Sequence, residues 1–398
     1  MSAPKRILLL DTGNEWGGGT NSMFELLKRI DRTRFDVTCC FYKDYKKGRS
    51  GRLLSEELAD IGIPLIVLPS RKQPLWAKLA KEIVRGLLAW SGRLKRRAVF
   101  AIEMAWRIKP RAAELQKLLS DEKFDLLYVN NQPASNLEGY LAVENLNIPM
   151  AQHCRCTPTL NAAEISILNR SNSPIICVSQ GVADVLKGYG LSGQRLRIVH
   201  NAIDSRMPLP EPVSPGCVAD SIVIGTVGRL NELKSVDHLI RAVARLCQNG
   251  LSVCCVVVGE GEERESLGQL AEKLGVADIV RFAGFQAVPL SWVQAMDICV
   301  LCSSKEGFPR VVLEAMLAAK PVVGSDVNGT RELVVNEETG LLYAYGDVPE
   351  LAASLRRLAQ DPSLRREMGN AGRRRVATYY SIEAYVSGVM KILVETLQ

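Results

Sequence analysis

The chain has 398 residues, of which 47% are apolar and 23% charged. This composition is typical of a globular protein and excludes disordered, collagen-like and disulfide-scaffold proteins. The length predicts two domains, because single cores usually stop growing at about 250 to 300 residues. The formal net charge is +7, and the excess of basic residues lies in one segment. Residues 71–111 hold twelve basic and two acidic residues, so the rest of the chain is slightly acidic.

The eleven cysteines are odd in number and lie in apolar runs such as Cys39-Cys40 and Cys254-Cys255. This usage predicts reduced, buried thiols in a cytosolic protein. Cys154 and Cys156 have no second pair at zinc-ligand spacing, so we expect no metal site there. The apolar run near the N-terminus is too short for a signal peptide, and no stretch reaches 18 uncharged apolar residues. We therefore expect a cytoplasmic protein without a membrane span.

Apolar, β-rich runs alternate with helical patterns in two series. The expected strands begin near Ile7, Phe35, Pro64, Phe124, Ile148, Ile175 and Leu196, and then near Ile222, Val253, Val280, Ile298, Val322 and Leu341. Continuous apolar strands that alternate with amphipathic helices predict buried parallel sheets covered on both faces. The fold class is thus α/β, with two doubly wound domains.

A proline-rich run separates the two series. Residues 207–215 hold four prolines, which cannot continue a helix or a central strand. We therefore expect a first domain over 1–205, a linker over 206–216, a second domain over 217–375, and a C-terminal helix over 376–398 that packs back towards the first domain. Ligands of such domains bind beyond the carboxyl ends of the strands, so two such edges can face one cleft.

The basic segment 71–111 begins with the pattern of an amphipathic helix. At 100° per residue, the apolar side chains from Leu75 to Trp90 fall on one side, and Lys78, Lys81 and Arg85 fall on the other. A basic helix with tryptophans is typical of a membrane interface. The side chains expected to contact a membrane or an acceptor are Trp76, Trp90, Arg93, Lys95, Arg96, Arg97 and Trp106.

Three interpretations of this segment remain open. Its apolar face packs on the sheet of the first domain, or it docks on an anionic membrane, where each cation contributes about 1 kcal/mol. Alternatively, the same charges attract nucleic acid without sequence specificity. We favour the membrane, which places the protein on the inner face of the plasma membrane, and we expect no specific nucleic-acid partner.

Glycine-rich turns follow the first strand of each series. Gly17 and Gly18 precede a helical pattern, and the N-terminus of such a helix presents free N–H groups to an anion. In the second series, Gly228-Arg229 is followed five residues later by Lys234; two fixed cations at the end of a parallel strand can clamp a diphosphate. Gly259 ends the next strand, in a turn that lacks the third glycine of a nicotinamide-cofactor site.

The most specific segment follows the strand that begins at Ile298. Glu306 and Gly307 lie in the loop ahead of a helix, Pro309 suits its first turn, and Glu314 lies about one and a half turns further on. One carboxylate can meet sugar hydroxyls at the mouth of the cleft and the other a hydroxyl pair such as a ribose. The glycine and the helix amides between them would face phosphate.

The spacing Glu306-x7-Glu314, in the setting Glu-Gly-Phe-Pro and Leu-Glu-Ala, resembles the signature of the retaining glycosyltransferases of family 4. The turn Asn201-Ala-Ile-Asp204 and the segment up to Glu332 also match that family, so the resemblance covers essentially the whole chain. It implies the GT-B fold, in which two Rossmann-like domains face each other.

The resemblance also implies roles for single residues. Arg229 and Lys234 correspond to the clamp on the donor diphosphate, Glu306 to a contact with the transferred sugar, and Glu314 to a contact with the ribose. The implied donor site further includes Gly17, Gly18, Gly259, Gly307, Phe308 and Pro309. His153 resembles the histidine of the first domain that lies at the reacting end of the sugar.

The sequence departs from the family pattern at three positions. Cys154 follows His153 where an acidic or amide residue is common, Ala202 replaces the glycine of the interdomain turn, and Ser235 replaces the glycine that often follows the clamp lysine. These departures leave the expected fold intact and weaken any inference about the donor.

We therefore expect a retaining glycosyltransferase with catalytic residues His153, Arg229, Lys234 and Glu306. It would take a nucleotide sugar as donor and a lipid-linked or cell-envelope glycan as acceptor. No metal or other cofactor is expected, since no Asp-x-Asp motif is present and two cations already supply positive charge. The alternatives are a sugar-nucleotide epimerase on a similar scaffold, and a non-catalytic protein that binds membranes or nucleic acid.

Overall fold

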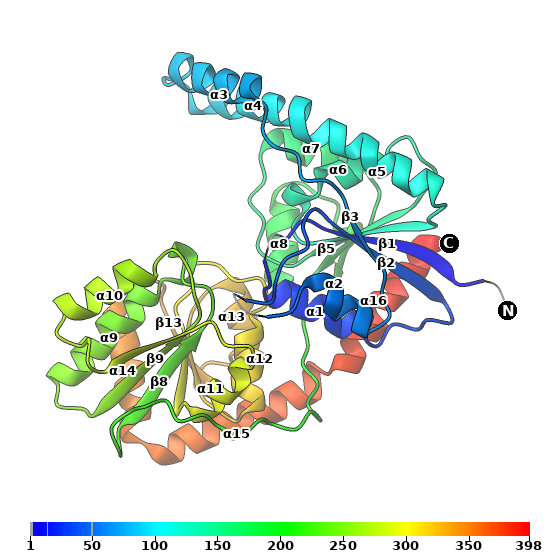
Figure 1. Ribbon diagram of the computed structural model, residues 1–398. Coiled ribbons are helices and arrows are strands. Elements are labelled where there is room, and N and C mark those ends of the chain that lie inside the picture. Colours follow the sequence, from blue (N-terminus) through cyan, green and yellow to red (C-terminus); the bar gives the residue numbers. More distant parts are fainter. Residues whose placement is uncertain (1–2, 14, 49–50) are drawn as a thin grey trace.

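The protein consists of two parallel α/β units that face each other, shown in Figure 1 as a computed structural model. The structure describes residues 3–13, 15–48 and 51–398. The fold class predicted from the sequence is confirmed. Each expected strand is present and begins within two residues of the expected position.

The first unit contains a seven-stranded parallel sheet in the order β3-β2-β1-β4-β5-β6-β7. Its strands are β1 (Lys5–Asp11), β2 (Phe35–Phe41), β3 (Leu65–Val67), β4 (Leu126–Asn130), β5 (Met150–Cys154), β6 (Ile175–Cys177) and β7 (Leu196–Ile198). Its helices are α1 (Gly18–Leu27), α2 (Leu54–Asp60), α3 (Leu75–Leu87), α4 (Gly92–Glu103), α5 (Lys109–Asp121), α6 (Leu137–Val143), α7 (Ala162–Arg170) and α8 (Gln180–Gly188). The central strands are buried throughout because helices cover both faces of the sheet.

The second unit repeats this plan with a six-stranded parallel sheet in the order β10-β9-β8-β11-β12-β13. Its strands are β8 (Ile222–Val227), β9 (Val253–Val258), β10 (Val280–Gly284), β11 (Ile298–Leu301), β12 (Val322–Ser325) and β13 (Gly340–Tyr343). Its helices are α9 (Val236–Gln248), α10 (Arg264–Lys273), α11 (Pro289–Ala295), α12 (Arg310–Leu317), α13 (Asn328–Leu333), α14 (Val348–Gln360) and α15 (Pro362–Tyr379). In both sheets the strand order reverses beside the first strand, where doubly wound folds bind their ligands.

Two segments cross between the units and contact each other. The proline-rich run 207–215 has no helix or strand. The second crossing leads from α15 into α16 (Ile382–Leu397), which packs on one face of the first sheet, with Tyr385 and Val389 in the same core as Tyr128. The backbone N–H of Ile203, just ahead of the first crossing, donates to the carbonyl of Tyr380 in the second crossing at 3.2 Å.

The cysteine prediction needs one correction. Cys217, just after the proline-rich run, forms a disulfide with Cys254 of β9, with their Cα atoms 5.8 Å apart. The sequence pattern missed this pair because the path of the irregular linker, and not the local apolar pattern, brings Cys217 beside the sheet. The other nine cysteines are free, and most of them are buried.

Helices α3 and α4 form a hairpin that projects from the first unit (Figure 1). In α3 the only buried residue is Ala77, and α4 has none. The apolar side chains of α3 are therefore exposed, which contradicts the interpretation that they pack on the first sheet. Leu75 is 76% exposed and Trp90, just beyond α3, is 78% exposed.

The base of this hairpin is held by charge. Glu103 of α4 forms ion pairs with Lys81 of α3 and with Arg107, one turn further on. Lys81 also lies 5.7 Å from the centre of the Trp106 ring, and Trp106 is half-buried there. Trp106 thus belongs to the base of the hairpin and not to its exposed face.

A carboxylate of the second unit caps a helix of the first. Glu332 of α13 accepts hydrogen bonds from the backbone N–H groups of Gln180 and Gly181, the first residues of α8, at 2.8 and 2.6 Å. His200 Nε2 lies 3.5 Å from the same carboxylate. Burial raises the pKa of Glu332, but hydrogen bonds from His200 and the two amides outweigh burial and lower it below the usual 4.5.

Replacing Glu332 with Gln should lower the free energy of unfolding by about 1 to 2 kcal/mol at neutral pH, because two hydrogen bonds lose their charged acceptor. A carboxylate whose pKa is lowered by folding stabilises the protein above its unfolded pKa, and this stabilisation is lost as the pH falls through the folded pKa. The difference between wild type and Glu332→Gln, measured by urea unfolding, should shrink as the pH falls below about 4.5. Glu338→Gln, an exposed carboxylate nearby, is the control and should change stability little at any pH.

Candidate functional site

The carboxyl ends of the central strands of both sheets meet between the two units. On the side of the second unit, β8 is followed by Gly228-Arg229 and β11 leads to Glu306. On the side of the first unit, β1 ends at Asp11 and β4 at Asn130. The candidate site is therefore built from loops at the reversal points of both sheets.

An ion pair in this site joins two residues that the sequence singled out. Lys234 Nζ lies 2.6 Å from Glu306 Oε1, and the Glu306 side chain is only 10% exposed. Lys234 ends a short 3-10 turn, Glu232–Lys234, and Ser235 after it has a φ of +45°. A left-handed φ favours glycine, which gives a physical reason for the glycine usual at this position in the resembled family.

Arg229 connects the two units. Its guanidinium forms an ion pair with Glu15 of the first unit, and Nη2 lies 3.2 Å from Glu262 Oε2 of the second unit. Half of the Arg229 side chain is exposed, so these pairs are weak and exchangeable. The predicted clamp residues Arg229 and Lys234 thus lie in one site, each compensated by carboxylates.

Glycines let the loops of the site approach each other closely. A Cβ on Gly259, whose φ is +138°, would lie 1.8 Å from the carbonyl oxygen of Gly228. A Cβ on Gly307 would lie 2.5 Å from the carbonyl oxygen of Arg155 in the first unit. Both glycines therefore have a packing role.

Glu314 lies on α12, one and a half turns from the start of that helix, as the sequence indicates. Its carboxylate is 3.8 Å from Arg310 Nη2. Burial raises the pKa of Glu314, and Arg310 partly opposes that rise. Arg310 also donates to the carbonyl of Ala202 in the interdomain turn at 3.2 Å. The sequence reasoning missed Arg310, which follows Pro309 at the start of the helix.

Gly17 and Gly18 open α1 on the opposite side of the cleft. Gly17 is the N-cap, and a Cβ on Gly18 would lie 3.8 Å from Arg310 Cδ. The start of α1 therefore faces α12 across the gap between the units, so the two glycines belong to the same site as Glu314.

Arg155 is the central residue that the sequence reasoning missed. It follows β5 and its guanidinium contacts Asn130 Oδ1 at 2.7 Å, Asn201 Oδ1 at 3.2 Å and the hydroxyl of Tyr385 at 3.1 Å. Buried Asp11 lies near it, and burial raises the pKa of that carboxyl. The place of Arg155 in the sequence could have indicated its role, because a residue just beyond a parallel strand lies at the edge of the sheet where ligands bind.

His153, which is predicted to be catalytic, does not share these contacts of Arg155. His153 lies inside β5 and is fully buried, and its Nδ1 is 2.6 Å from the hydroxyl of Tyr128. Among the described residues nothing hydrogen-bonds its Nε2. Burial, with a smaller effect from Arg155, holds the pKa of His153 well below 6.5, so the ring is neutral. The ring packs towards α16, with its centre 6.3 Å from that of Tyr385.

Phe308 and Pro309, which are predicted to bind the donor, also have structural roles. The ring of Phe308 is buried, with its centre 4.8 Å from His200 and 5.2 Å from Tyr380. The Phe308 carbonyl accepts from Asn201 Nδ2 at 3.0 Å. Phe308 thus contacts residues of the first unit, whereas Pro309 is the N-cap of α12.

The second unit has a small cavity beside Gly228, Arg229 and Lys234, which measures about 10 Å³. Small-molecule sites usually measure about 300 to 1,000 Å³, so this cavity alone does not hold a nucleotide. In the described part of the chain, no three His, Cys, Asp or Glu side chains are grouped so that they could hold a metal ion.

Comparison with models of protein families shows to which family the chain belongs. Residues 16–206 match the model described as Glycosyltransferase Family 4, and residues 213–375 match that of Glycosyl transferases group 1. Together these matches span most of the sequence. The chain belongs to glycosyltransferase family 4. The resemblance stated from the sequence is thereby confirmed.

Two relatives of this family 4 chain come from one bacterium. The lipopolysaccharide core biosynthesis glycosyltransferase LpsE of Rhizobium meliloti is 31% identical over 225 residues, which cover 56% of this chain and 65% of LpsE. LpsD of the same organism is 31% identical over 55% of this chain and 62% of its own length. The chain thus matches less than two thirds of the length of these two relatives.

Solved structures confirm the GT-B fold. Anabaena HepE in complex with UDP-glucose superposes with a TM-score of 0.76 at 22% identity, over 98% of this chain and 99% of HepE. The lipopolysaccharide outer core galactosyltransferase WaaB superposes with a TM-score of 0.70 at 17% identity, over 98% of this chain and 99% of WaaB. These likenesses concern the arrangement of the two Rossmann-like units.

Gly259→Ala should destabilise the protein by about 3 kcal/mol or more, because a left-handed φ and a clash with the Gly228 carbonyl act together. The matched control is Gly86→Ala in α3, where no atom lies within 4 Å of the new methyl group. That control should leave stability unchanged or raise it by up to about 1 kcal/mol. Thermal unfolding of both variants measures the difference, and equal midpoints would contradict the packing role of Gly259.

Proposed function

We propose that this protein is a retaining glycosyltransferase that transfers a sugar from a nucleotide diphosphate sugar to a hydroxyl group of a lipid-linked or cell-envelope glycan. The observation that carries the proposal is the Lys234–Glu306 pair at the reversal point of the second sheet, with Arg229 on the same loop. The UDP-glucose bound by HepE and the lipopolysaccharide role in the name of LpsE support the donor and acceptor classes.

The pairing of charges indicates how a donor enters. Without a donor, Lys234 is neutralised by Glu306, and Arg229 by Glu15 and Glu262. A diphosphate that reaches this site can take the place of the carboxylates at both cations, because phosphate oxygens accept strong, charge-assisted hydrogen bonds. Glu306 is then free to accept hydrogen bonds from the hydroxyls of the sugar.

The reaction breaks the bond between the anomeric carbon and the diphosphate oxygen. The electron pair leaves with the diphosphate, whose growing charge is stabilised by Arg229 and Lys234. The acceptor hydroxyl attacks from the face that the diphosphate leaves, so the anomeric configuration is retained, and its proton passes to the departing phosphate oxygen. We place Glu314 at the ribose of the donor and the start of α1, with Gly17 and Gly18, at the phosphates.

We further propose that the transfer needs no metal ion. The positive charge that a bound cation would supply is provided by two side chains, Arg229 and Lys234. Addition of EDTA should therefore leave the initial rate unchanged.

Lys234→Ala and Glu306→Gln should each lower turnover about 10²-fold to 10³-fold, because each removes one interaction with the reacting donor. The measurement is release of UDP from UDP-hexoses in the presence of a lipid-linked glycan fraction. Lys305→Ala, an exposed neighbour, is the control and should keep full activity. NMR of the product determines the anomeric configuration.

The same assay separates the alternatives. An epimerase would convert the UDP-hexose to an isomer without acceptor, and a non-catalytic protein would give no turnover in any variant. An inverted product would contradict the retaining mechanism while leaving the donor site intact.

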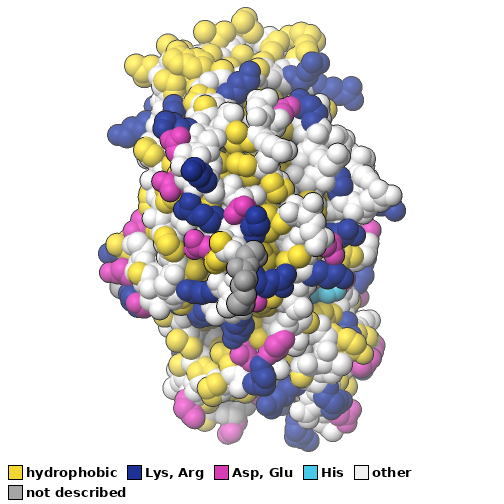
Figure 2. Space-filling view, turned by 90° about the vertical axis from the view of Figure 1, so that its right-hand side faces the viewer, with side chains coloured by type: hydrophobic (Ala, Val, Ile, Leu, Met, Phe, Trp, Pro, Cys, Tyr) yellow, Lys and Arg dark blue, Asp and Glu magenta, His cyan; other side chains and the backbone are white. Residues whose placement is uncertain are grey.

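We also propose that the hairpin of α3 and α4 docks the protein on an anionic membrane. Figure 2 shows hydrophobic side chains gathered at the end of the molecule that the hairpin forms, with Lys and Arg close by. The exposed apolar side chains are Leu75, Trp76, Leu79, Ile83, Leu87, Trp90 and Leu94. Soluble proteins rarely leave so large an apolar surface uncovered, and the flanking cations favour anionic lipid over a neutral partner.

The cations of the turn and of α4 supply the electrostatic part of this docking. Arg93, Arg96 and Arg97 are exposed, and Lys95 is half-buried. In the described ranges, no helix has the length and apolarity needed to cross a bilayer. The proposed location is therefore peripheral, on the cytoplasmic face, with the acceptor presented in the same membrane.

Neutralising Arg93, Lys95, Arg96 and Arg97 together to Gln should lower binding to liposomes containing anionic phosphatidylglycerol at least about tenfold, since each cation near the surface contributes about 1 kcal/mol. The control neutralises four exposed arginines of α14 and α15, namely Arg356, Arg366, Arg373 and Arg374, which removes the same charge elsewhere. Flotation measures the bound fraction, and a duplex DNA competitor tests nucleic acid as the partner. Equal loss of binding in both quadruple variants would contradict docking through the hairpin.

A further inference from the structure

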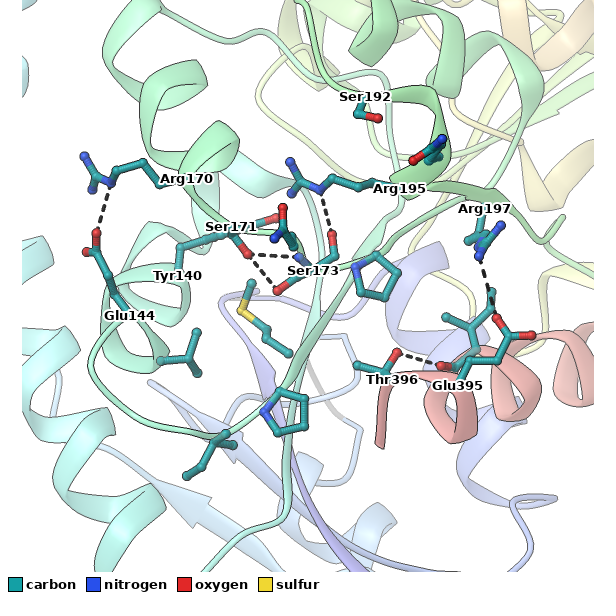
Figure 3. Close-up of a pocket in the computed structure, with 18 of the residues that line it drawn as sticks. Tyr140, Glu144, Arg170, Ser171, Ser173, Ser192, Arg195, Arg197, Glu395 and Thr396 are labelled. Carbon is teal, nitrogen blue, oxygen red and sulfur yellow. Dashed lines mark hydrogen bonds and ion pairs between the residues drawn. The ribbon is translucent and has the colours of Figure 1, made fainter. Parts of the chain in front are cut away.

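A second cavity lies at the opposite edge of the first sheet from the candidate site. It measures about 750 Å³ and is bordered by α6, α7, the starts of β5 and β6, β7, and the end of α16 (Figure 3). Pro149 and Pro174, which directly precede β5 and β6, lie on its wall. The donor chemistry proposed above takes place at the carboxyl ends of these strands, so this cavity is separate from it.

Three arginines and two glutamates line the cavity. Arg170 pairs with Glu144 at 3.0 Å and Arg197 pairs with Glu395 at 3.8 Å. In Figure 3, Arg195 lies between these two pairs. No carboxylate of the described chain pairs with Arg195, so the cavity has one positive charge in excess.

Arg195 is held in place by the backbone and not by an anion. Its Nε and Nη1 donate to the carbonyls of Ser173 and Leu168, both at 3.0 Å. Its Nη2 is buried, and no described residue accepts from it. Burial lowers the pKa of Arg195, which reflects a cation that has lost water without gaining a counter-charge.

A second unpartnered group lies beside this cation. Tyr140 is 3% exposed, and its hydroxyl has no hydrogen-bond partner among the described residues. The hydroxyls of Ser171 and Ser173 are neighbours in the same wall, 2.7 Å apart. Unsatisfied buried polar groups are rare in folded proteins, and a ligand is one of the reasons for them.

The rest of the wall is apolar. The side chains of Val143, Ile148, Ile167 and Ile392 line the cavity, and Ile392 belongs to α16. The cavity thus combines one uncompensated cation, a few hydroxyls and an apolar surface. This is the composition of a site for a small molecule with a charged end and a hydrocarbon part.

We propose that this cavity binds a small amphipathic monoanion, with its carboxylate or phosphodiester group at Arg195 and Tyr140 and its apolar part against Ile148, Ile167 and Ile392. One negative charge balances the three arginines and two glutamates. The anion accepts hydrogen bonds from Arg195 Nη2 and from the Tyr140 hydroxyl, which removes both unsatisfied donors.

The bound molecule also stabilises the docking of α16 on the first unit. The end of α16 contributes Ile392, Glu395 and Thr396 to the cavity wall. Nearer its start, the Tyr385 hydroxyl contacts Arg155 at the carboxyl edge of the same sheet. A ligand that bridges the last turn of α16 and β7 therefore favours the folded, docked helix.

The test uses the full chain and thermal unfolding with two monoanionic probes, octanoate and monomeric dihexanoylphosphatidylglycerol. The unfolding midpoint should rise with the logarithm of the probe concentration, because each probe binds only the folded state. Dihexanoylphosphatidylcholine, with the same chains and no net charge, should give at least about tenfold weaker apparent affinity. A response to octanoate alone assigns a carboxylate ligand, and a response to the glycerol lipid alone assigns a phosphodiester.

Two variants locate the effect. Arg195→Gln should weaken the apparent affinity at least about tenfold, since it removes the charged donor. Tyr140→Phe removes only a hydroxyl without a partner, so it should fold normally and still bind about threefold to tenfold more weakly. Arg356→Gln, on the exposed face of α14, is the matched control and should bind as wild type.

The proposal is overturned if neither anionic probe raises the midpoint of the wild type. It is also overturned if the zwitterionic lipid is as effective as the anionic one, or if Arg195→Gln and Tyr140→Phe respond like Arg356→Gln. The readout is binding and not sugar transfer, so the result does not depend on the proposed enzymatic function.

Discussion

The two sheets meet where backbone lies against backbone. Gly307 leaves no room for a Cβ beside the carbonyl of Arg155, and a Cβ on Gly329 would lie 2.3 Å from the carbonyl of Gly307. A side chain at either position would push the first unit, α12 and α13 apart. This close approach brings Glu15 to Arg229, Thr157 to the Glu306 carbonyl and Glu332 to the start of α8. The geometry of the site depends on it.

The charged side chains at this contact between the units each have a charged or polar partner. Lys234 has Glu306, Arg310 has Glu314, and Arg155 is surrounded by amide and hydroxyl oxygens. The pairs of Arg229 are partly exposed, and such pairs contribute little to stability and can be exchanged for a ligand at low cost. A diphosphate donor can therefore replace the carboxylates at Arg229. Glu306 is nearly buried, so the hydroxyls of the proposed sugar must compensate its carboxylate when Lys234 turns to the donor.

The excess positive charge of the chain does not lie at the proposed donor site. All of the excess lies in residues 71–111, whose helices project from the first unit and leave most of their large apolar side chains exposed. The cations of the donor site are few and are compensated by glutamates. Charge and apolar exposure thus bear on where the protein works, and the loops at the sheet edges bear on what it does. The cavity at Arg195 adds a third feature, at the far edge of the first sheet.

The sequence by itself determined the thirteen strands, the two units and the loops with Arg229, Lys234, Glu306 and Glu314, because apolar runs and helical periods are local signals and the family signature is contiguous. Only the tertiary structure decided which side chains reach the cleft. His153 and Arg155 are two residues apart, yet the first lies inside β5 and the second beyond its end. Phe308, Arg310 and the Cys217–Cys254 disulfide likewise depend on how segments distant in sequence pack together, which no local pattern specifies.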